Sequence, residues 1–222
     1  MTKQQAITAL MLDFGCVISK TMFENMELVE RGLGFAPGTL SWRGPLNPGS
    51  DPLWQDMLDG RLTERQYWAT RATEVSALLG ESWDTRTFYD RACDICGLAW
   101  FRGEFVDLLG DARRAGIRAG ILSNELELFH SPDWLKTVPA LEQIDVIVDA
   151  THTKVLKPDP RAYQLGLEAL GAKPEETLFV DDQIRNVRGA EAVGIPSVHF
   201  DVRRPAENMR EIRRRLALPV RA

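Results

Sequence analysis

Two adjacent carboxylates, Asp181 and Asp182, stand at the end of the apolar run 177–180. Like charges at the end of a buried strand repel each other unless a cation lies between them. Asp13 also follows an apolar run, residues 7–12, and carboxylate oxygens are ligands that Mg²⁺ prefers. These three residues predict a magnesium site in which Asp13 can also act as a nucleophile.

Three further polar residues suit the same chemistry. Ser123 and Asn124 follow the apolar run 120–122, and Lys157 precedes a proline and a helix start. A hydroxyl and nearby backbone N–H groups can donate to phosphoryl oxygens, and a lysine can neutralise the nucleophile and the transferring group. Together with Asp13 they predict phosphoryl transfer through an aspartyl-phosphate. Taken singly, each has a simpler reading: Asp13 as a cap, Ser123-Asn124 as a turn, Lys157 as part of a helix start.

The elements that must position these residues alternate between strand and helix. Apolar runs predict strands at 7–12, 120–122, 145–148, 177–180 and 196–200, and amphipathic patterns with caps predict helices at 104–115, 160–170 and 184–193. This alternation favours an α/β fold with a doubly wound, mostly parallel sheet. Ligands of such sheets bind at the carboxyl ends of the strands, where Asp13, Ser123-Asn124 and Asp181-Asp182 lie.

Residues 20–98 interrupt the alternation with helical patterns. Thr63 and Gln66 have capping-box spacing, and residues 34–52 form a loop rich in glycine and proline. We therefore predict a discontinuous core, residues 1–19 and 99–222, with a helical insertion at 20–98.

The bulk composition is that of an ordinary globular protein. The formal net charge of −5 gives no reason to expect a nucleic-acid partner. No apolar run approaches the ~18 residues that span a bilayer, and three cysteines cannot all pair within one chain. We expect a cytoplasmic protein without a membrane partner; the oligomeric state stays open.

Four segments in order, LMLDFGCVI, GILSNE, LKPDPRAY and LFVDDQIRNVRGA, resemble the four motifs of the haloacid dehalogenase superfamily. The resemblance covers the whole chain and implies a Rossmann-like core with a helical cap. It implies that Asp13 is the nucleophile and a metal ligand, Ser123 binds phosphate and Lys157 neutralises charge. Asp182 would bind magnesium directly, Asp181 directly or through water, and Asn186 would order the acidic loop.

One position departs from the phosphatases of this superfamily, which usually carry a second aspartate two residues after the nucleophile. Here that position is Gly15, whose carbonyl can bind magnesium but which has no proton to donate. Losing general acid–base help typically costs ~10²–10⁴-fold in rate. A similar branch with Asp-x-Gly-x-Val includes sugar-phosphate phosphatases and relatives fused to epoxide hydrolases. We expect Gly15, Cys16, Ser123, Asn124 and Arg43 to bind the substrate.

Three readings stay open. We expect a magnesium-dependent phosphatase of a small phosphorylated metabolite, such as a sugar phosphate. A metal-independent 2-haloacid dehalogenase would use Arg43 and Tyr163 but leaves Asp181-Asp182 unexplained. A catalytically weak phosphometabolite-binding protein would follow from Gly15. Phosphonatase chemistry is set aside, since it needs a cap lysine and none lies between Lys20 and Lys136.

The insertion offers candidate substrate contacts. Arg43, next to Trp42 in the 34–52 loop, suits a second anionic group on the substrate. Trp54 and Trp68 sit in helical patterns typical of packing. Glu125 follows the Ser-Asn pair and is a candidate sugar contact or proton donor, beside its simpler role as a helix cap.

Overall fold

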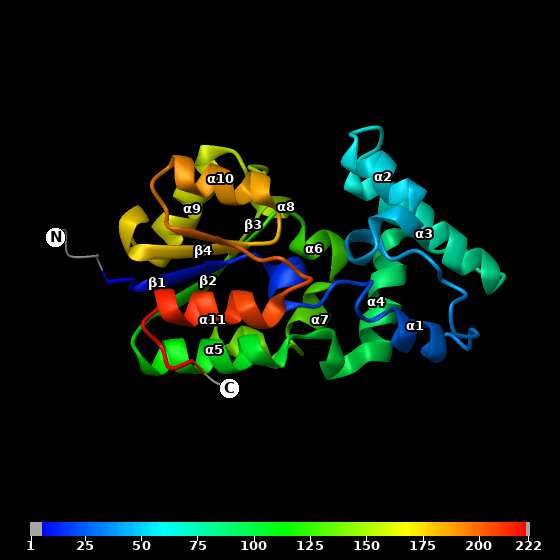
Figure 1. Ribbon diagram of the computed structural model, residues 1–222, viewed down its shortest axis with the longest axis horizontal. Helices are drawn as coiled ribbons and strands as arrows, with labels where there is room; N and C mark the ends of the chain where they lie inside the picture. The colour runs from blue at the N-terminus through cyan, green and yellow to red at the C-terminus, as the bar shows by residue number, and fades with distance from the viewer. Residues whose placement is uncertain (1–5, 221–222) are drawn as a thin grey trace. The chain divides into compact units, whose positions relative to one another are not determined.

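The computed structural model describes residues 6–220, which Figure 1 traces from β1 to α11. They divide into two compact units. The first contains residues 6–19, 101–127 and 135–220, and the second contains 20–100 and 128–134. The division predicted from the sequence assigned residues 128–134 to the core, whereas their contacts group them with the helical unit.

The first unit is built on a five-stranded sheet in which every pairing is parallel. Its strands are β1 (Ala9–Leu12), β2 (Arg118–Ser123), β3 (Val146–Asp149), β4 (Thr177–Asp181) and β5 (Ser197–His199). Their order across the sheet is β3-β2-β1-β4-β5, so the chain winds first to one side of β1 and then to the other. The predicted α/β fold with a doubly wound parallel sheet is confirmed.

The central strands form because their side chains are apolar on both faces. Leu10, Met11 and Leu12 of β1 are at most 1% exposed, as are Phe179 and Val180 of β4. A parallel sheet covered by helices on both sides requires such continuous apolar runs. The edge strand β3 is only partly buried.

Helices cover both faces of this sheet, α9 and α10 on one side and α5 and α11 on the other (Figure 1). They span α5 (Gly103–Arg114), α9 (Pro160–Leu170), α10 (Ile184–Ala192) and α11 (Pro205–Arg215). Shorter turns are η1 (Phe14–Ile18), α6 (Leu126–Phe129), α7 (Pro132–Leu135), η5 (Pro139–Gln143), α8 (Ala150–Thr153) and η6 (Pro174–Glu176). Under α9 and α10 lies a core that includes Met11, Leu122, Leu167 and Phe179. Burying each such side chain contributes ~1.5–3 kcal/mol.

The second unit is helical, as the pattern of residues 20–98 predicts. Its elements are α1 (Met26–Gly32), η2 (Gly44–Leu46), η3 (Pro48–Ser50), α2 (Pro52–Leu58), α3 (Glu64–Leu78), α4 (Thr85–Cys96) and η4 (Gly97–Trp100). The predicted capping box is confirmed, because Thr63 accepts from the Gln66 N–H and the Gln66 side chain accepts from the Thr63 N–H. Across residues 6–220, no helix has the length and apolar character needed to cross a bilayer.

An aromatic cluster fills this unit around a buried charge. Phe23 packs against Trp42 and Trp54 at ring-centroid distances of 5.9 and 5.2 Å. Asp51, which is fully buried, accepts from the Tyr67 hydroxyl at 2.6 Å and from Arg71 at 2.5 Å. A buried carboxylate requires such partners, so Asp51 is held as part of the packing of this unit.

Candidate active site

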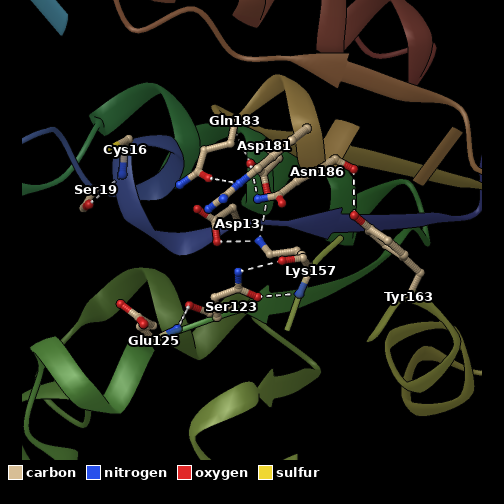
Figure 2. Close-up of polar contacts among 12 residues, drawn as sticks. Asp13, Cys16, Ser19, Ser123, Glu125, Lys157, Tyr163, Asp181, Gln183 and Asn186 are labelled. Atoms are coloured by element: carbon tan, nitrogen blue, oxygen red, sulfur yellow. Dashed lines mark hydrogen bonds and ion pairs between the residues drawn. The ribbon is translucent and has the colours of Figure 1, made fainter. Parts of the chain in front are cut away.

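The polar residues of the sequence motifs meet at one edge of the first unit's sheet. Leu12, the last residue of β1, pairs with Ile121 of β2 and with Val180 of β4. The strands are parallel, so the residues that follow them emerge side by side. This register brings Asp13, Ser123 and Asp181 to the carboxyl edge, as Figure 2 shows. It is the edge at which open α/β sheets bind ligands.

Lys157 links two of these carboxylates. Its Nζ lies 2.8 Å from Asp13 Oδ1 and 2.7 Å from Asp181 Oδ2 (Figure 2). Burial disfavours the charged ammonium, but attraction to Asp13 and Asp181 outweighs it and raises the pKa of Lys157 above its usual range. Burial raises the pKa of Asp13 to about 6, although the lysine opposes this shift. Lys157 is therefore a fixed positive charge beside a carboxylate that is costly to ionise.

Asn124 fixes the main chain of Lys157. Its Oδ1 accepts from the Lys157 N–H at 2.7 Å and its Nδ2 donates to the Lys157 carbonyl at 3.1 Å. The sequence motif predicts Asn124 as a substrate-binding residue. In the structure both ends of its amide bind the lysine segment, so Asn124 places Lys157.

Asp181 has its oxygens committed within the protein. Oδ1 accepts from the Gln183 N–H at 2.8 Å, and the Asn186 Nδ2 donates to both oxygens at 3.1 Å. Asn186 thus lies where the motif predicts an asparagine beside the acidic pair. Its own Oδ1 is buried and has no hydrogen-bond partner among the described residues.

Two contacts that sequence reasoning missed hold the lysine segment against the acidic segment. The hydroxyl of Tyr163, on α9, donates to the Asn186 carbonyl on α10 at 2.7 Å. At Gly189 on α10, an added Cβ would lie 2.7 Å from that hydroxyl and 2.8 Å from Pro158. Only glycine permits this approach. The sequence does contain a signal for this close contact: a glycine lies within an amphipathic helix, where it costs ~1 kcal/mol relative to alanine.

The loop that follows Asp13 has an unusual backbone. Cys16 has φ +63°, in the left-handed region that non-glycine residues seldom adopt, and its N–H donates to Ser19 Oγ at 3.3 Å. Gly15 has φ −63° and ψ 135°, a conformation open to any residue. A Cβ at Gly15 would meet only Asp13 Oδ2, at an ordinary 3.9 Å. Neither backbone nor space therefore requires a glycine where related phosphatases have an aspartate.

The acidic residues fit a magnesium ion. Oxygens of Asp13, Asp181 and Asp182 all lie within 4.8 Å of one another. Lys157 pairs with Asp13 and Asp181, and a cation would offset the repulsion among the three carboxylates. Carboxylate oxygens are ligands that Mg²⁺ prefers. Asp182 is more exposed than Asp181, whose oxygens already accept hydrogen bonds.

The remaining predicted residues lie at varied places. Ser123 is the last residue of β2 and is 7% exposed; its Oγ accepts weakly, at 3.4 Å, from the Glu125 N–H. Arg43 belongs to the second unit, where its guanidinium donates to the carbonyls of Leu40 at 2.5 Å and Trp42 at 3.1 Å. Trp42 itself is 6% exposed and packs within the aromatic cluster.

A second group of possible ligands, Glu127, Asp149 and His152, has a structural explanation. The oxygens of Asp149 accept from the N–H groups of Glu127 and Thr151 at 2.9 Å each, which caps α8. His152 pairs with Glu127 at 2.9 Å, and this hydrogen bond raises the pKa of the imidazole. We assign this group to the packing of α8.

The chain matches a known family over most of the motifs. The family described as haloacid dehalogenase-like hydrolase matches residues 49–194, well over half of the 222 residues. The chain belongs to the haloacid dehalogenase-like hydrolases. The match includes Ser123, Lys157 and the acidic pair, and the sheet places Asp13, which precedes it, beside them. The expectation of a hydrolase enzyme is confirmed.

Curated relatives of two activities resemble parts of this hydrolase. Phosphatase MT3486 of Mycobacterium tuberculosis (strain CDC 1551 / Oshkosh) is 37% identical over 93 residues, which cover 42% of this chain and 43% of the relative. (S)-2-haloacid dehalogenase 1 of Pseudomonas sp. (strain CBS-3) is 32% identical over 104 residues, 46% of this chain and 45% of the relative. Phosphoglycolate phosphatase of Salmonella typhimurium is 30% identical over 92 residues, 41% and 36%. The matches thus span less than half the length of these relatives.

Solved structures of this family share the fold. The magnesium-bound HAD-hydrolase YfnB from Bacillus subtilis has a TM-score of 0.63 at 14% identity, covering 87% of this chain and 86% of that one. A dehalogenase structure has a TM-score of 0.59 at 20% identity, covering 89% and 86%. At these identities the likeness concerns the fold alone.

Proposed function

We propose that this hydrolase is a magnesium-dependent phosphatase that acts on a small phosphorylated metabolite, with Asp13 as the nucleophile. One observation carries the proposal: the Lys157 ammonium joins Asp13 to Asp181 at a strand edge where a third carboxylate, Asp182, completes a potential cation site. The phosphatases among the partial relatives support the same reaction class.

In this proposal the chain's oxygen atoms hold the ion. Asp13, Asp182 and the Gly15 carbonyl would hold it directly, and Asp181 would contribute through water, because its oxygens accept hydrogen bonds from Lys157, Asn186 and Gln183. When bound, Mg²⁺ offsets the negative charge that would repel a phosphate dianion and polarises the phosphoryl group.

The protein residues divide the remaining work. Lys157 stabilises the ionised form of Asp13 and the charge of the transferring group. Ser123 donates its hydroxyl to a phosphoryl oxygen, and the Gly15 N–H donates to another. Asp13 then attacks phosphorus, the bond to the leaving oxygen breaks, and the phosphoryl group is carried on the Asp13 carboxylate. Water hydrolyses this aspartyl-phosphate in the second half of the reaction.

Protonation of the leaving group is the step for which this chain provides the least support. Gly15 has no side chain to donate it, so the enzyme is best suited to substrates whose leaving oxygen has a low pKa. An acyl phosphate, an aryl phosphate or the anomeric phosphate of a sugar meets this requirement better than a simple alkyl phosphate. We propose such a substrate, with the helical second unit acting as a cap.

The dehalogenase alternative rests on Arg43 and Tyr163, and neither contact favours it. The Tyr163 side chain is fully buried and its hydroxyl donates to the Asn186 carbonyl. The Arg43 guanidinium donates to carbonyls of its own loop. Asp181 and Asp182 also have no function in a metal-independent attack on carbon.

The experiment is a hydrolysis assay with an aryl phosphate, with and without Mg²⁺. We expect activity that requires Mg²⁺, is absent from Asp13→Asn, and in Asp182→Asn needs a higher Mg²⁺ concentration. Glu168→Gln, an exposed change on α9, is the matched control and should behave as wild type. Equal rates for wild type and Asp13→Asn would reject the proposal. Halide release from 2-haloacids in excess EDTA would favour the dehalogenase, and phosphate binding without turnover across a substrate panel would indicate a binding protein.

A further inference from the structure

Arg102 is a buried arginine that reaches the loop after the nucleophile. It lies directly before α5, is 4% exposed, and its guanidinium stacks over the Phe200 ring with Cζ 5.1 Å from the centroid. From there Nε and Nη2 donate to one acceptor, the Cys16 carbonyl, at 3.3 and 3.2 Å. The two residues are 86 positions apart in the sequence, so the fold itself creates this contact.

The acceptor belongs to a residue whose backbone needs support. A non-glycine residue in the left-handed region, such as Cys16, is strained and persists only when surrounding contacts impose it. Here the contacts come from both sides. Ser19 Oγ accepts from the Cys16 N–H, and Arg102 donates twice to the Cys16 carbonyl.

A second contact ties the same segments together. The Arg102 N–H donates to the Ile18 carbonyl at 3.0 Å, and Ser19 pairs with Phe101 in an antiparallel bridge. The segment 101–102 is therefore fixed to 18–19 by its main chain while the Arg102 side chain reaches back to Cys16. The turn 14–18 is closed by this arginine.

We propose that Arg102 is a positioning residue, which holds the Cys16 carbonyl and so sets the orientation of the Gly15–Cys16 peptide group. This group carries the Gly15 carbonyl and the Cys16 N–H, which rotate together when the Cys16 backbone relaxes. The inference rests on the proposed function, in which the Gly15 carbonyl binds the cation. Arg102 acts through this backbone.

The test compares Arg102→Ala with Arg213→Ala. Arg213 is a matched control because it is also buried, at 3% exposed, but pairs with Asp111 at 2.7 Å and the Pro219 carbonyl at 3.0 Å. Hydrogen exchange of the amides in residues 14–18, measured without Mg²⁺ or substrate, should accelerate in Arg102→Ala and stay as wild type in Arg213→Ala. The kcat/KM for an aryl phosphate should fall ~100-fold in Arg102→Ala, mainly in kcat, since small misplacements of reacting groups have effects of this size.

Chemical rescue separates positioning from general damage. Guanidinium chloride at low millimolar concentration should restore part of the activity of Arg102→Ala, whereas sodium chloride at equal ionic strength should not. Arg102→Lys, with one donor group in place of a fork, should be intermediate. Unchanged exchange in residues 14–18 would overturn the inference, and so would faster exchange with wild-type kcat/KM. An inactive wild-type protein would reject the proposed function, and the exchange measurement would then decide alone whether Arg102 holds the turn.

Discussion

The Asn124 side chain holds the main chain of Lys157: it accepts from the Lys157 N–H at 2.7 Å and donates to the Lys157 carbonyl at 3.1 Å. The ammonium of the same lysine contacts Asp13 and Asp181. Asn124, which directly follows β2, therefore fixes the main chain of the lysine whose side chain bonds both carboxylates. The main chain of this buried lysine is thus held by one segment of the chain, and its ammonium contacts carboxylates from two others.

Asn124→Ala should misplace Lys157 and lower kcat by at least tenfold, with the Lys157 main-chain groups left unpaired. Losing these partners should also cost ~1–3 kcal/mol of unfolding free energy. Asn208→Ala is the control, since Asn208 donates similarly to the Asp201 carbonyl at 2.7 Å on α11. Urea unfolding and steady-state kinetics measure the two effects. A wild-type kcat in Asn124→Ala would contradict the positioning of Lys157 by Asn124.

Lys157→Met should abolish activity and destabilise the protein, because Asp13 and Asp181 lose the charge that both contact. Breaking a buried ion pair on one side typically costs ~3–5 kcal/mol. Adding Asp181→Asn should recover much of that stability without restoring activity. If the double variant is no more stable than Lys157→Met in metal-free urea unfolding, unpaired charge is not the cause of the loss.

The raised pKa of Asp13 predicts a specific dependence of the protein's stability on pH. Burial raises its pKa from an ordinary 3.8 to about 6, so between these values the folded state binds the proton more tightly than the unfolded chain. The contribution of Asp13 to stability is therefore present below pH ~4 and is lost as the pH rises through ~6. In metal-free buffer Asp13→Asn should be more stable than wild type at pH 7, and the difference should vanish toward pH 4. Thermal unfolding across this range tests it; a difference that grows on acidification has the wrong sign.

Gly15→Asp should fold normally, because its backbone angles suit any residue and its Cβ position is open. A carboxyl there supplies a proton donor worth ~10²-fold or more with poor leaving groups. We expect kcat/KM to rise for alkyl phosphates and to change little for aryl phosphates, which flattens its dependence on leaving-group pKa. Gly15→Asn is the matched variant of similar size without an acid, and an equal gain in both variants would exclude proton donation.

The strand ends could be read from the sequence because each part of the signal is local. A continuous apolar run marks a strand buried on both faces, and parallel pairing then gathers whatever follows the strands. Asp13, Ser123 and Asp181 meet for this reason alone. Lys157 follows no strand: it was included because its charge suits phosphoryl transfer, and its local pattern, a helix start, did not show that it lies beside Asp13 and Asp181.

Contacts between helices could not be predicted from local sequence patterns. Tyr163 has the spacing of an ordinary core residue on α9, and nothing near it in sequence shows that its hydroxyl reaches Asn186. Arg102 precedes a helix at a place where an arginine is unremarkable, and its bond to Cys16 depends on the path of residues 18–19. Such contacts are determined by tertiary packing, and no periodic sequence pattern marks them.

The segment 128–134 packs with the second unit although it follows β2 of the first. Phe129 lies 4.8 Å from Tyr89 between ring centroids, and His130 stacks on Trp134 at 4.4 Å and contacts Cys93. The part of this protein that could be exchanged with a relative is consequently two stretches of chain. A chimera that replaces only residues 20–100 would strand the aromatic side chains of 128–134 without their partners. The second unit keeps its packing in such an exchange only when residues 20–100 and 128–134 are replaced together.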